Sequence, residues 1–335
     1  MTKITLLGAG SWGTALSGLL FRNGHSVAVW SLFPEEIEML QFHREHKDKL
    51  PGIHLPPDVV FTTDIKEALE GTSVVVFVVP SQKVRETARS VRPFLDRNTI
   101  VAICSKGLEE NTGLRLSEII EQELGNVRVV ALTGPSHAEE VALDMPTTVV
   151  AASKDKEAAE FVQDVFMSSR FRVYTSSDII GAELGAAFKN IIALCSGICD
   201  GLGYGDNCKA ALMTRGLTEI ARLGKAMGAA AETFSGLTGM GDLIVTCTST
   251  HSRNWKTGYL IGQGIPLEKA LQEIKMVVEG VTAAKAAYSL SLKVGISMPI
   301  VEQAYKILFD GIPPALAVET LMERKKKNES EDAGW

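Results

Sequence analysis

A lone lysine in an otherwise small and apolar helical stretch is the first candidate for chemistry in this chain. Residues 181–199, GAELGAAFKNIIALCSGIC, contain Lys189 as their only cation. Burial lowers the pKa of a lysine, so a partly buried Lys189 beside a cleft would exchange a proton with a substrate oxygen near neutral pH. The alternative is a lysine whose ammonium simply reaches water. Asn190 beside it adds a hydrogen-bond donor and an acceptor.

A carboxylate further along the chain is the second candidate. Asp242 lies between glycines and an apolar run in GLTGMGDLIVT, residues 236–246. Glycines let the backbone or a ligand approach closely, because they carry no side chain. We expect Asp242 to accept a substrate hydroxyl or to hold Lys189 charged, and the alternative is a helix N-cap.

Basic residues add groups that suit an anion. Ser252, Arg253 and Asn254 present a hydroxyl, a guanidinium and an amide in succession, which suits a phosphate and equally an ordinary polar loop. Lys106 follows an apolar run in the sequence SKG and adds positive charge, unless it too belongs to an exposed loop.

A glycine-rich turn at the start of the chain predicts where a dinucleotide binds. Residues 4–13, ITLLGAGSWG, are a short apolar strand that runs into Gly8-x-Gly10-x-x-Gly13, and a helical pattern follows over residues 14–23. Gly8 permits the tight turn, Gly10 lets the backbone approach a pyrophosphate, and Gly13 lets the helix pack on the strand. The alternative is a glycine-rich loop of another fold, and the flanking strand and helix favour the nucleotide site.

Apolar runs predict the sheet that must position these residues. Further strand candidates are residues 25–30, 73–79, 99–104, 128–132, 147–151 and 170–174, with helical connections between most of them. Buried β-branched runs of this kind favour a largely parallel sheet. Turn sequences at 80–81, 105–107 and 134–136 follow three of the strands, so we expect the ligand groove at the carboxyl edge. A polar helix over residues 34–47 completes the first βαβ unit.

The sequence changes character at about Asp178. Long segments with helical periodicity, rich in alanine and leucine, follow it and alternate with glycine-containing turns. We therefore predict an α/β chain with a doubly wound, Rossmann-like dinucleotide-binding domain over residues 1–180 and an all-helical substrate-binding domain over residues 181–335. A basic run followed by an acidic one predicts a frayed tail from about residue 324.

Composition excludes several function classes. The chain has 335 residues, 45% of them hydrophobic, and a net charge of -6. This length is typical of two domains, and the acidic balance argues against a general affinity for nucleic acid or anionic membrane. No signal peptide is visible, and no uninterrupted apolar stretch approaches the roughly twenty residues of a membrane span, so we expect a cytoplasmic protein without an integral membrane segment.

Cysteines and histidines form no metal-binding pattern. The five cysteines are an odd number without a C-x-x-C pair, and most lie in apolar runs, which indicates reduced, buried thiols. Cys195 and Cys199 would face one another on a helix, but two thiolates alone do not make a zinc site. His43, His46 and His54 lie in a stretch typical of solvated helix and loop. We therefore expect no metal.

Seven motifs, taken in order, resemble those of the bacterial glycerol-3-phosphate dehydrogenases. They are GAGSWGTAL at 8, SKGLE at 105, GPSHAEEVA at 134, ELGAAFKNIIA at 183, GDLIVTC at 241, SRN at 252 and VVEG at 277. The set spans both predicted domains and is more specific than any single motif. The resemblance implies reduction of dihydroxyacetone phosphate to sn-glycerol 3-phosphate with NADH or NADPH for phospholipid synthesis. It also implies a homodimer whose helical domain is of the 6-phosphogluconate dehydrogenase C-terminal type.

The resemblance implies a role for each candidate residue. The catalytic residues would be Lys189, as the acid-base group, with Lys106, Asp242 and Thr246. The substrate-binding residues would be Lys106, Gly134, Ser136, Lys189, Asn190, Asp242, Ser252, Arg253 and Asn254, of which 252–254 hold the phosphate. Cofactor contacts would come from Gly8, Gly10, Ser11, Trp12, Gly13, Lys106, Ala138, Arg253, Val277 and Glu279. Because Arg253 serves both ligands, cofactor and substrate are expected to bind with positive coupling.

Two positions depart from the family pattern. Residues 31–33, Ser-Leu-Phe, contain neither the acidic residue that often binds the ribose hydroxyls of NAD nor the arginine that binds the 2′-phosphate of NADP, and the first acid is Glu35. Cofactor choice therefore stays open. Trp255 and Lys256 stand where relatives usually carry further arginine, which weakens the positive field near the phosphate.

Two other functions share parts of this pattern. A related β-hydroxyacid or 6-phosphogluconate-type dehydrogenase has the same architecture but prefers a carboxylate substrate. A nucleotide-sensing regulatory protein would keep the Rossmann fold and lose the chemistry. The joint presence of Lys106, Lys189, Asp242 and Arg253 speaks against it, since a sensor needs no proton donor.

Overall fold

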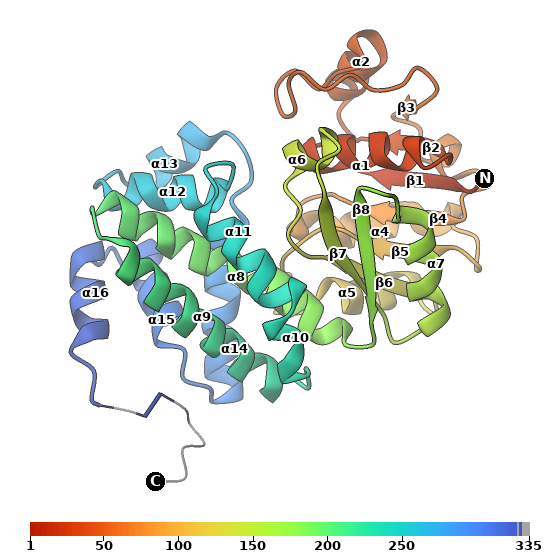
Figure 1. Ribbon diagram of the computed structural model, residues 1–335. Coiled ribbons are helices and arrows are strands. Elements are labelled where there is room, and N and C mark those ends of the chain that lie inside the picture. The colour runs from red at the N-terminus through yellow and green to blue at the C-terminus, as the bar shows by residue number, and fades with distance from the viewer. Residues whose placement is uncertain (327, 330–335) are drawn as a thin grey trace.

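An eight-stranded sheet forms the core of the N-terminal half of the molecule (Figure 1). The structure is a computed structural model that describes residues 1–326 and 328–329. The strands are β1 (Lys3–Leu7), β2 (Ser26–Trp30), β3 (Val60–Thr62), β4 (Val74–Phe77), β5 (Ile100–Ile103), β6 (Arg128–Thr133), β7 (Thr147–Ala152) and β8 (Phe171–Ser176). Their order is β3-β2-β1-β4-β5-β6-β7-β8, and neighbouring strands run parallel except β6 and β7.

The strand register brings four loops to one edge of the sheet. Leu7 at the end of β1 pairs with Phe77 of β4, Phe77 pairs with Ile103 of β5, and Ile103 pairs with Ala131 of β6. The turns that follow these strands, including the glycine loop, therefore meet at the carboxyl edge. In open α/β sheets this edge binds ligands where the strand order reverses, here between β1 and β4.

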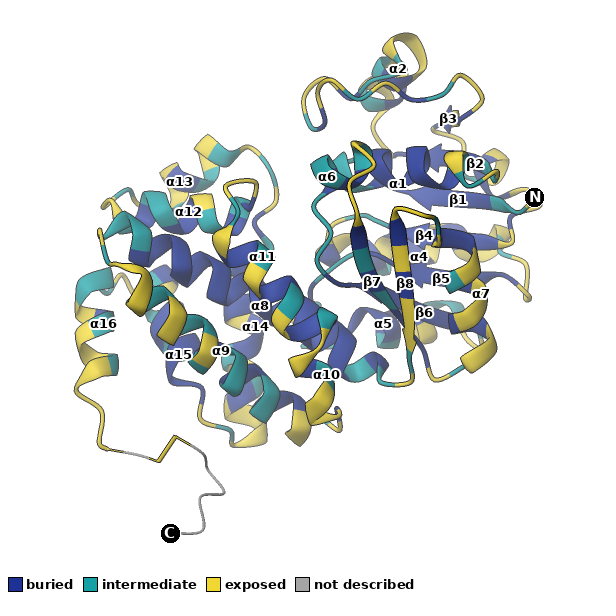
Figure 2. Cartoon of the chain, in the orientation of Figure 1, coloured by how far each residue is buried: buried dark blue, intermediate teal, exposed yellow. Residues whose placement is uncertain are grey.

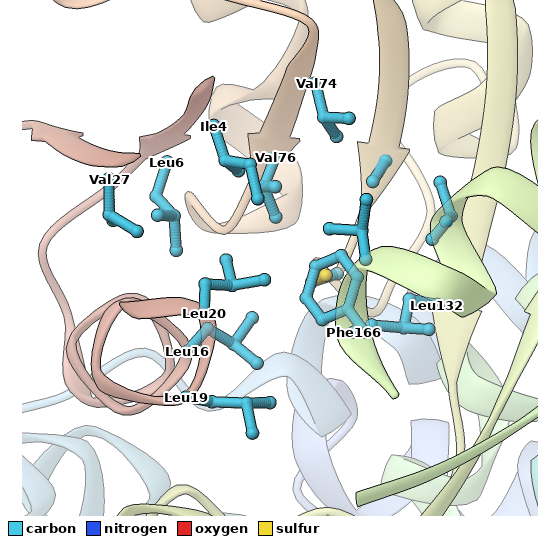
Figure 3. Packing of buried hydrophobic residues seen from close by; sticks show 14 of the residues in the cluster. Ile4, Leu6, Leu16, Leu19, Leu20, Val27, Val74, Val76, Leu132 and Phe166 are labelled. Atoms are coloured by element: carbon cyan, nitrogen blue, oxygen red, sulfur yellow. The ribbon is translucent and has the colours of Figure 1, made fainter. Parts of the chain in front are cut away.

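Alternate residues of each strand face two different cores, because side chains in a strand alternate between faces. Ile4 and Val74 pack against α1 (Ser11–Arg22), α2 (Pro34–His43), α6 (Ala138–Ala142) and α7 (Lys156–Phe166), and Figure 3 shows Leu16 and Phe166 in this cluster. Leu7 packs on the other face against α3 (Ile65–Leu69), α4 (Val84–Val91) and α5 (Leu116–Leu124). Short turns η1 (Ser81–Lys83) and η2 (Arg92–Phe94) flank α4.

Ten helical segments form the C-terminal half of the described chain. They are α8 (Ile179–Gly201), α9 (Asp206–Ala226), α10 (Ala231–Ser235), the π-helical turn η3 (Leu237–Gly241), α11 (Asp242–Thr248), α12 (Arg253–Gly262), α13 (Leu267–Ile274), α14 (Glu279–Val294), α15 (Pro299–Phe309) and α16 (Pro314–Met322). A Rossmann-like sheet followed by a helical assembly confirms the predicted fold class.

The long helix α8 lies at the centre of this half, as its dark colour in Figure 2 shows. By length and composition it is long and apolar enough to cross a membrane, but nearly all of it is buried inside the protein, as in the core helix of a globular unit. Ile179 and Ala182 in its first turn pack against the sheet, and Leu184 onward belongs to the helical core. The division of the chain at residue 180 stays a prediction, because α8 contributes to both cores.

Several predicted elements differ from those observed. The helix expected over residues 14–23 begins at Ser11, so the glycine loop leads directly into it. The helix expected to reach residue 47 ends at His43, because Arg44 adopts a left-handed conformation with φ 54°. The strand β3 was not predicted, since only three of its residues pair. Residue 327 and the end of the predicted tail, 330–335, lie outside the described residues.

One prediction about a histidine was wrong, and one cysteine contact was not predicted. Sγ of Cys199 lies 3.6 Å from Sγ of Cys208, at the start of α9. His46 is not solvated but buried, and its Nε2 lies 3.8 Å from Oε1 of Glu36. In the described part of the chain, no three His, Cys, Asp or Glu side chains lie together as metal ligands would.

Candidate active site

Two lysines from opposite halves of the molecule meet on one buried carboxylate. Asp242, the first residue of α11, is 1% exposed. Nζ of Lys106, from the loop after β5, donates to its Oδ2 at 2.8 Å, and Nζ of Lys189, from α8, donates to its Oδ1. Lys189 also donates to Oγ1 of Thr246 at 2.7 Å, one turn further along α11. Asp242 is therefore the counter-ion of both lysines and not a helix N-cap.

Burial and charge set the protonation of this cluster. Burial lowers the pKa of Lys189 to about 8, although the Asp242 carboxylate opposes the change. Burial alone would raise the pKa of Asp242, but the charges of Lys106 and Lys189 bring it below its usual range. Two cations then face one anion, so the cluster carries an excess positive charge whenever Lys189 is protonated. Such a site attracts an electron-rich oxygen and has a proton to give.

Lys106 also fastens the cluster to the edge of the sheet. Its Nζ donates to the backbone oxygen of Gly134 at 2.9 Å, and Oγ of Ser136 donates to the same oxygen at 2.9 Å. Gly134 has φ +135°, which a residue with a side chain rarely adopts, and a Cβ there would press on Val149. The predicted residues 134 and 136 therefore lie next to Lys106.

Arg253, the first residue of α12, is a candidate anion-binding residue. Ser252 caps this helix by accepting from the backbone N–H of Trp255 at 3.2 Å. Arg253 is partly exposed; the burial of its guanidinium lowers its pKa, and the carboxylates of Glu279 and Glu139 oppose that change. Within the described residues this guanidinium makes no hydrogen bond or ion pair. A partly buried guanidinium without a partner, at a helix N-terminus, suits a phosphate.

The two asparagines of the predicted site hold helices together. Nδ2 of Asn254 donates to Oδ1 of Asn190 at 3.0 Å, and the backbone N–H of Gly280 donates to Oδ1 of Asn254 at 2.8 Å. These bonds join α12 to α8 and α14. A Cβ on Gly280 would press on the backbone oxygen of Asn190, so the close approach requires glycine.

The glycine loop has the shape of a pyrophosphate cradle. Gly8 has φ +122°, and a Cβ on Gly13 would overlap the backbone oxygen of Gly8, so neither position tolerates a side chain. A Cβ on Gly10 would meet nothing within 4 Å, which leaves open space beside the loop. No side chain caps the N-terminus of α1, which begins at Ser11. Free backbone N–H groups at a helix N-terminus fit an anionic pyrophosphate.

The remaining predicted cofactor residues surround the same edge without forming one bonded network. Nε1 of Trp12 is buried and has no partner among the described residues. Ala138 begins α6 and packs near Trp12, whereas Val277 is exposed before α14. Glu279 is already engaged: its carboxylate accepts from the backbone N–H of Ser81 at 3.0 Å and from its Oγ at 2.6 Å. Sequence reasoning missed Ser81 as a partner, although it lies in a strand-end turn.

A carboxylate that sequence reasoning missed lies at the end of β2. Oγ of Ser31 donates to Oε2 of Glu36 at 2.8 Å, and Lys49 and His46 approach Oε1 of the same carboxylate. Burial would raise the pKa of Glu36, but the nearby His46 and the hydrogen bonds from Lys49 and Ser31 lower it to about 2. Residues 31–33 contain no acid, yet the first turn of α2 brings one to Ser31. The helix start at Pro34 was the available signal.

A glycine cradle on a Rossmann-like sheet, facing a buried lysine with a lowered pKa, defines a nicotinamide-dependent oxidoreductase. The chain belongs to the NAD-dependent glycerol-3-phosphate dehydrogenase family. Residues 3–159 match the family model described as NAD-dependent glycerol-3-phosphate dehydrogenase N-terminus, and residues 178–319 match the one described as its C-terminus.

Curated relatives and a solved structure cover nearly the whole chain. The chain is 54% identical to the glycerol-3-phosphate dehydrogenase [NAD(P)+] of Bacillus subtilis, over 99% of this chain and 97% of the relative. It is 52% identical to the enzyme of that name from Agathobacter rectalis, over 100% of both chains. The crystal structure of glycerol-3-phosphate dehydrogenase from Coxiella burnetii superposes with a TM-score of 0.94, at 39% identity, over 96% of this chain and 99% of that one.

Proposed function

We propose that this chain interconverts dihydroxyacetone phosphate and sn-glycerol 3-phosphate with NADH or NADPH, and so supplies glycerophospholipid synthesis. The observation that carries the proposal is the cluster of Lys106, Asp242 and Lys189, which forms only where the sheet edge meets α8 and α11. Arg253 supplies the separate anion site that a phosphorylated ketone requires, and the family match supports the same substrate.

Lys189 is the proposed acid-base residue. When bound, the nicotinamide supplies or accepts the hydride. In reduction, the Lys189 ammonium donates a proton to the substrate oxygen, and in oxidation its amine removes the hydroxyl proton. Asp242 and Thr246 fix the direction of its Nζ, since both hold that atom by hydrogen bonds. Lys106 stabilises negative charge that develops on the substrate oxygen.

The phosphate group is assigned to the start of α12. Arg253 provides the charge and Ser252 provides a hydroxyl whose hydrogen remains to be donated, because its oxygen already accepts from Trp255. Asn254 contributes chiefly by position, since Asn190 and Gly280 already occupy its amide. Gly134 and Ser136 are assigned to the substrate side of Lys106.

The cofactor is assigned to the loop 8–13 and the residues around it. Ser11 and Trp12 offer backbone N–H groups at the N-terminus of α1, and Trp12 offers its unpartnered indole N–H. Ala138, Val277, Glu279 and Arg253 are assigned as further cofactor contacts. One guanidinium would then touch both ligands.

The experiment that tests this function follows the oxidation of NADH and, separately, of NADPH by the purified protein with dihydroxyacetone phosphate. We expect turnover with at least one nucleotide, and no comparable turnover with a panel of 2-hydroxy and 3-hydroxy acids in reverse. Turnover confined to the carboxylate substrates would favour the β-hydroxyacid dehydrogenases. A folded protein that binds nucleotide without turnover would favour the sensor.

A homodimer in the cytoplasm completes the proposal, and the family resemblance supports it. Analytical ultracentrifugation of the purified protein checks the assembly, because a dimer and a monomer of this chain differ twofold in mass. Fractionation of the source cells checks the compartment.

A further inference from the structure

Two cysteine thiols touch at the turn between α8 and α9. Cys199 lies in the last turn of α8 and Cys208 in the first turn of α9, and the Cys208 thiol donates to Sγ of Cys199 at 3.6 Å. Cys199 is buried, whereas Cys208 is partly exposed beside an open depression lined by residues 203–208. Sulfur atoms at this separation are in van der Waals contact, so side-chain rotation together with a slight approach of α9 toward α8 brings them to the S–S distance of about 2.05 Å.

We propose that Cys199 and Cys208 form a reversible disulfide on exposure to a peroxide, and that this bond weakens binding of the phosphorylated substrate. The second half of the proposal rests on the function proposed above. Nothing in the reaction requires either thiol, because neither contacts Lys189, Asp242 or Arg253.

The chemistry balances with one peroxide for each disulfide. The more accessible Cys208 reacts first: its sulfur bonds to a peroxide oxygen, the O–O bond breaks, and water leaves, which gives a sulfenic acid. The sulfur of Cys199 then attacks the sulfur of Cys208, the S–O bond breaks, and the hydroxide leaves with the Cys199 proton as a second water. Burial raises the pKa of Cys199 and keeps its thiol protonated, so Cys208 is the sulfur that reacts with the peroxide first.

Contacts around the turn connect the cysteines to the phosphate site. Asp200, next to Cys199, accepts from Nζ of Lys209 at 3.0 Å, and Lys209 follows Cys208. The other oxygen of Asp200 accepts from Nε1 of Trp255 at 2.7 Å. Trp255 lies in the first turn of α12, two residues after Arg253. Movement of the turn therefore reaches the anion site through Trp255.

The end of α8 and the start of α12 are tightly packed, so neither can move far without moving the other. A Cβ on Gly197 would overlap the backbone oxygen of Trp255, so the end of α8 and the start of α12 already touch at their backbones. Close-packed elements transmit displacements instead of absorbing them. A disulfide that draws α9 toward α8 is thus expected to displace Ser252 and Arg253.

The test uses the full-length protein before and after hydrogen peroxide, with dithiothreitol to reverse the reaction. A protease that cuts before aspartate, at Asp200 and Asp206, places Cys199 and Cys208 on separate peptides, so mass spectrometry detects the disulfide as a linked pair. We expect the link in the wild type and not in Cys208→Ser or Cys199→Ala. Cys195→Ala, one turn earlier on α8, is the matched control and should retain the link.

Kinetics test the functional half with the same samples. We expect oxidation to raise KM for dihydroxyacetone phosphate by at least about fivefold, the lower end of typical coupling between sites, with a smaller change in the Kd for NADH, most of whose assigned contacts lie away from α12. Dithiothreitol should restore KM, and Cys208→Ser should not respond. Absence of the linked peptides overturns the proposal, and a link with unchanged KM overturns the connection to the phosphate site.

A failure of the proposed function is distinguishable from these outcomes. Reduced protein that does not turn over dihydroxyacetone phosphate refutes the function, whereas the linked peptides report the disulfide independently of activity. A rise in KM that Cys208→Ser shares would assign the effect to another oxidised side chain and overturn the proposal.

Discussion

Lys189 shows how one buried residue acquires an acid-base role. Its pKa of about 8 results from burial, partly offset by the attraction of Asp242. An unperturbed lysine would hold its proton too tightly to release it at neutral pH. The contact with Asp242 keeps the ammonium in place, and the contact with Thr246 fixes its orientation.

The two directions of the reaction should respond to pH with opposite sign. Reduction requires protonated Lys189, so kcat/KM for dihydroxyacetone phosphate should fall as pH rises through about 8. Oxidation requires the neutral amine, so kcat/KM for sn-glycerol 3-phosphate should rise over the same range. Initial rates measured from pH 6 to 10 in both directions check this, and profiles of the same sign would exclude Lys189 as the group that titrates.

Replacement of Lys189 by methionine tests the same role without titration. Lys189→Met keeps an apolar chain of similar length and removes the proton, so kcat should fall roughly 10² to 10⁴-fold, the range typical of general acid-base groups. The Kd for NADH should change little. Unchanged turnover of the folded variant would remove Lys189 from the mechanism.

Glu36 should tune the choice between the two nucleotides. In Rossmann folds the adenosine ribose lies at the end of the second strand, where Ser31 holds the Glu36 carboxylate. Glu36→Gln removes a negative charge there and releases Lys49, so it should raise the ratio of kcat/KM for NADPH over NADH. The exposed neighbour Glu35 gives the matched control, Glu35→Gln. An equal change of this ratio in both variants would mean that the net charge of the protein, and not the position of Glu36, determines the nucleotide preference.

Among the elements, α8 and α12 depend on glycines at their crossing. A Cβ on Gly258 of α12 would overlap the backbone oxygen of Leu194 of α8, so the two helices lie in backbone contact. Gly201 and Gly262 meet in the same way one turn further on. This crossing positions the start of α12, where Asn254 bonds to Asn190, the neighbour of Lys189 in α8.

Two opposed effects determine how substitution of Gly258 by alanine changes the free energy of unfolding. Alanine gains about 1 kcal/mol over glycine in a helix interior, but overpacking costs about 1–3 kcal/mol and here involves backbone that cannot rotate away. We expect Gly258→Ala to lower the free energy of unfolding and to raise KM for the phosphorylated substrate. Gly205→Ala, where a Cβ meets nothing within 4 Å, is the control for urea denaturation and kinetics. A variant as stable as this control would refute the packing argument.

Glu219 of α9 should make stability depend on pH. Its carboxylate accepts from the backbone N–H groups of Ile300 and Val301 at the start of α15, and burial raises its pKa to about 7. The folded state therefore binds the proton more tightly than the unfolded state. This stabilisation is fully present below about pH 4.5 and is lost as pH rises through about 7.

The difference between wild type and Glu219→Gln isolates this effect. Between pH 4.5 and 8 the wild type should lose about 3 kcal/mol of unfolding free energy relative to the variant, which cannot ionise. Urea denaturation at the two pH values measures the change. Parallel pH dependence of the two proteins would mean that Glu219 keeps an ordinary pKa.

Local sequence patterns predicted which helices and strands exist better than they predicted the residues at which these elements end. The glycine loop and the apolar strands were predicted because each depends on residues close in sequence, such as Gly8 and Gly13. The end of α2 was not, because it depends on the left-handed conformation of Arg44. The antiparallel pairing of β6 and β7 was missed as well. The direction of a strand depends on the path of the connection before it, which the apolar pattern of the strand does not reveal.

The same distinction separates the predicted and missed parts of the site. The motif resemblance named Lys106, Lys189 and Asp242, and the structure brings them into contact. The bonds of Ser81 to Glu279 and of Cys208 to Cys199 were missed, because each partner alone is an unremarkable residue and only the tertiary fold places them together.

For the whole molecule, polar contacts between the two halves surround the groove. Besides Lys106 and Asp242, Ser81 bonds to Glu279, and the buried Glu183 of α8 accepts from Arg115 and Ser117 at the start of α5. Each pair joins a residue of the sheet half to one of the helical half. The relative position of the halves therefore determines whether the catalytic cluster exists.

Cofactor and substrate should consequently stabilise each other on the protein. sn-Glycerol 3-phosphate should lower the Kd for NADH, a nonreacting pair that calorimetry can measure, because Arg253 would contact both ligands. Arg253→Ala should abolish this coupling and raise KM for the phosphorylated substrate, whereas the exposed Lys256→Ala should preserve it. Coupling that survives in Arg253→Ala would place its origin in closure of the two halves alone.

The buried helix α8 has a consequence for how the chain is made. Ribosomes release α8 before α12 and α14, the helices that cover it, so a 23-residue apolar segment waits several seconds for its partners. During that interval it has the length and composition of a membrane span. Nascent chains stalled before Arg253 should therefore recruit chaperones or aggregate. Chains that include α14 should no longer do so, because α8 is then covered.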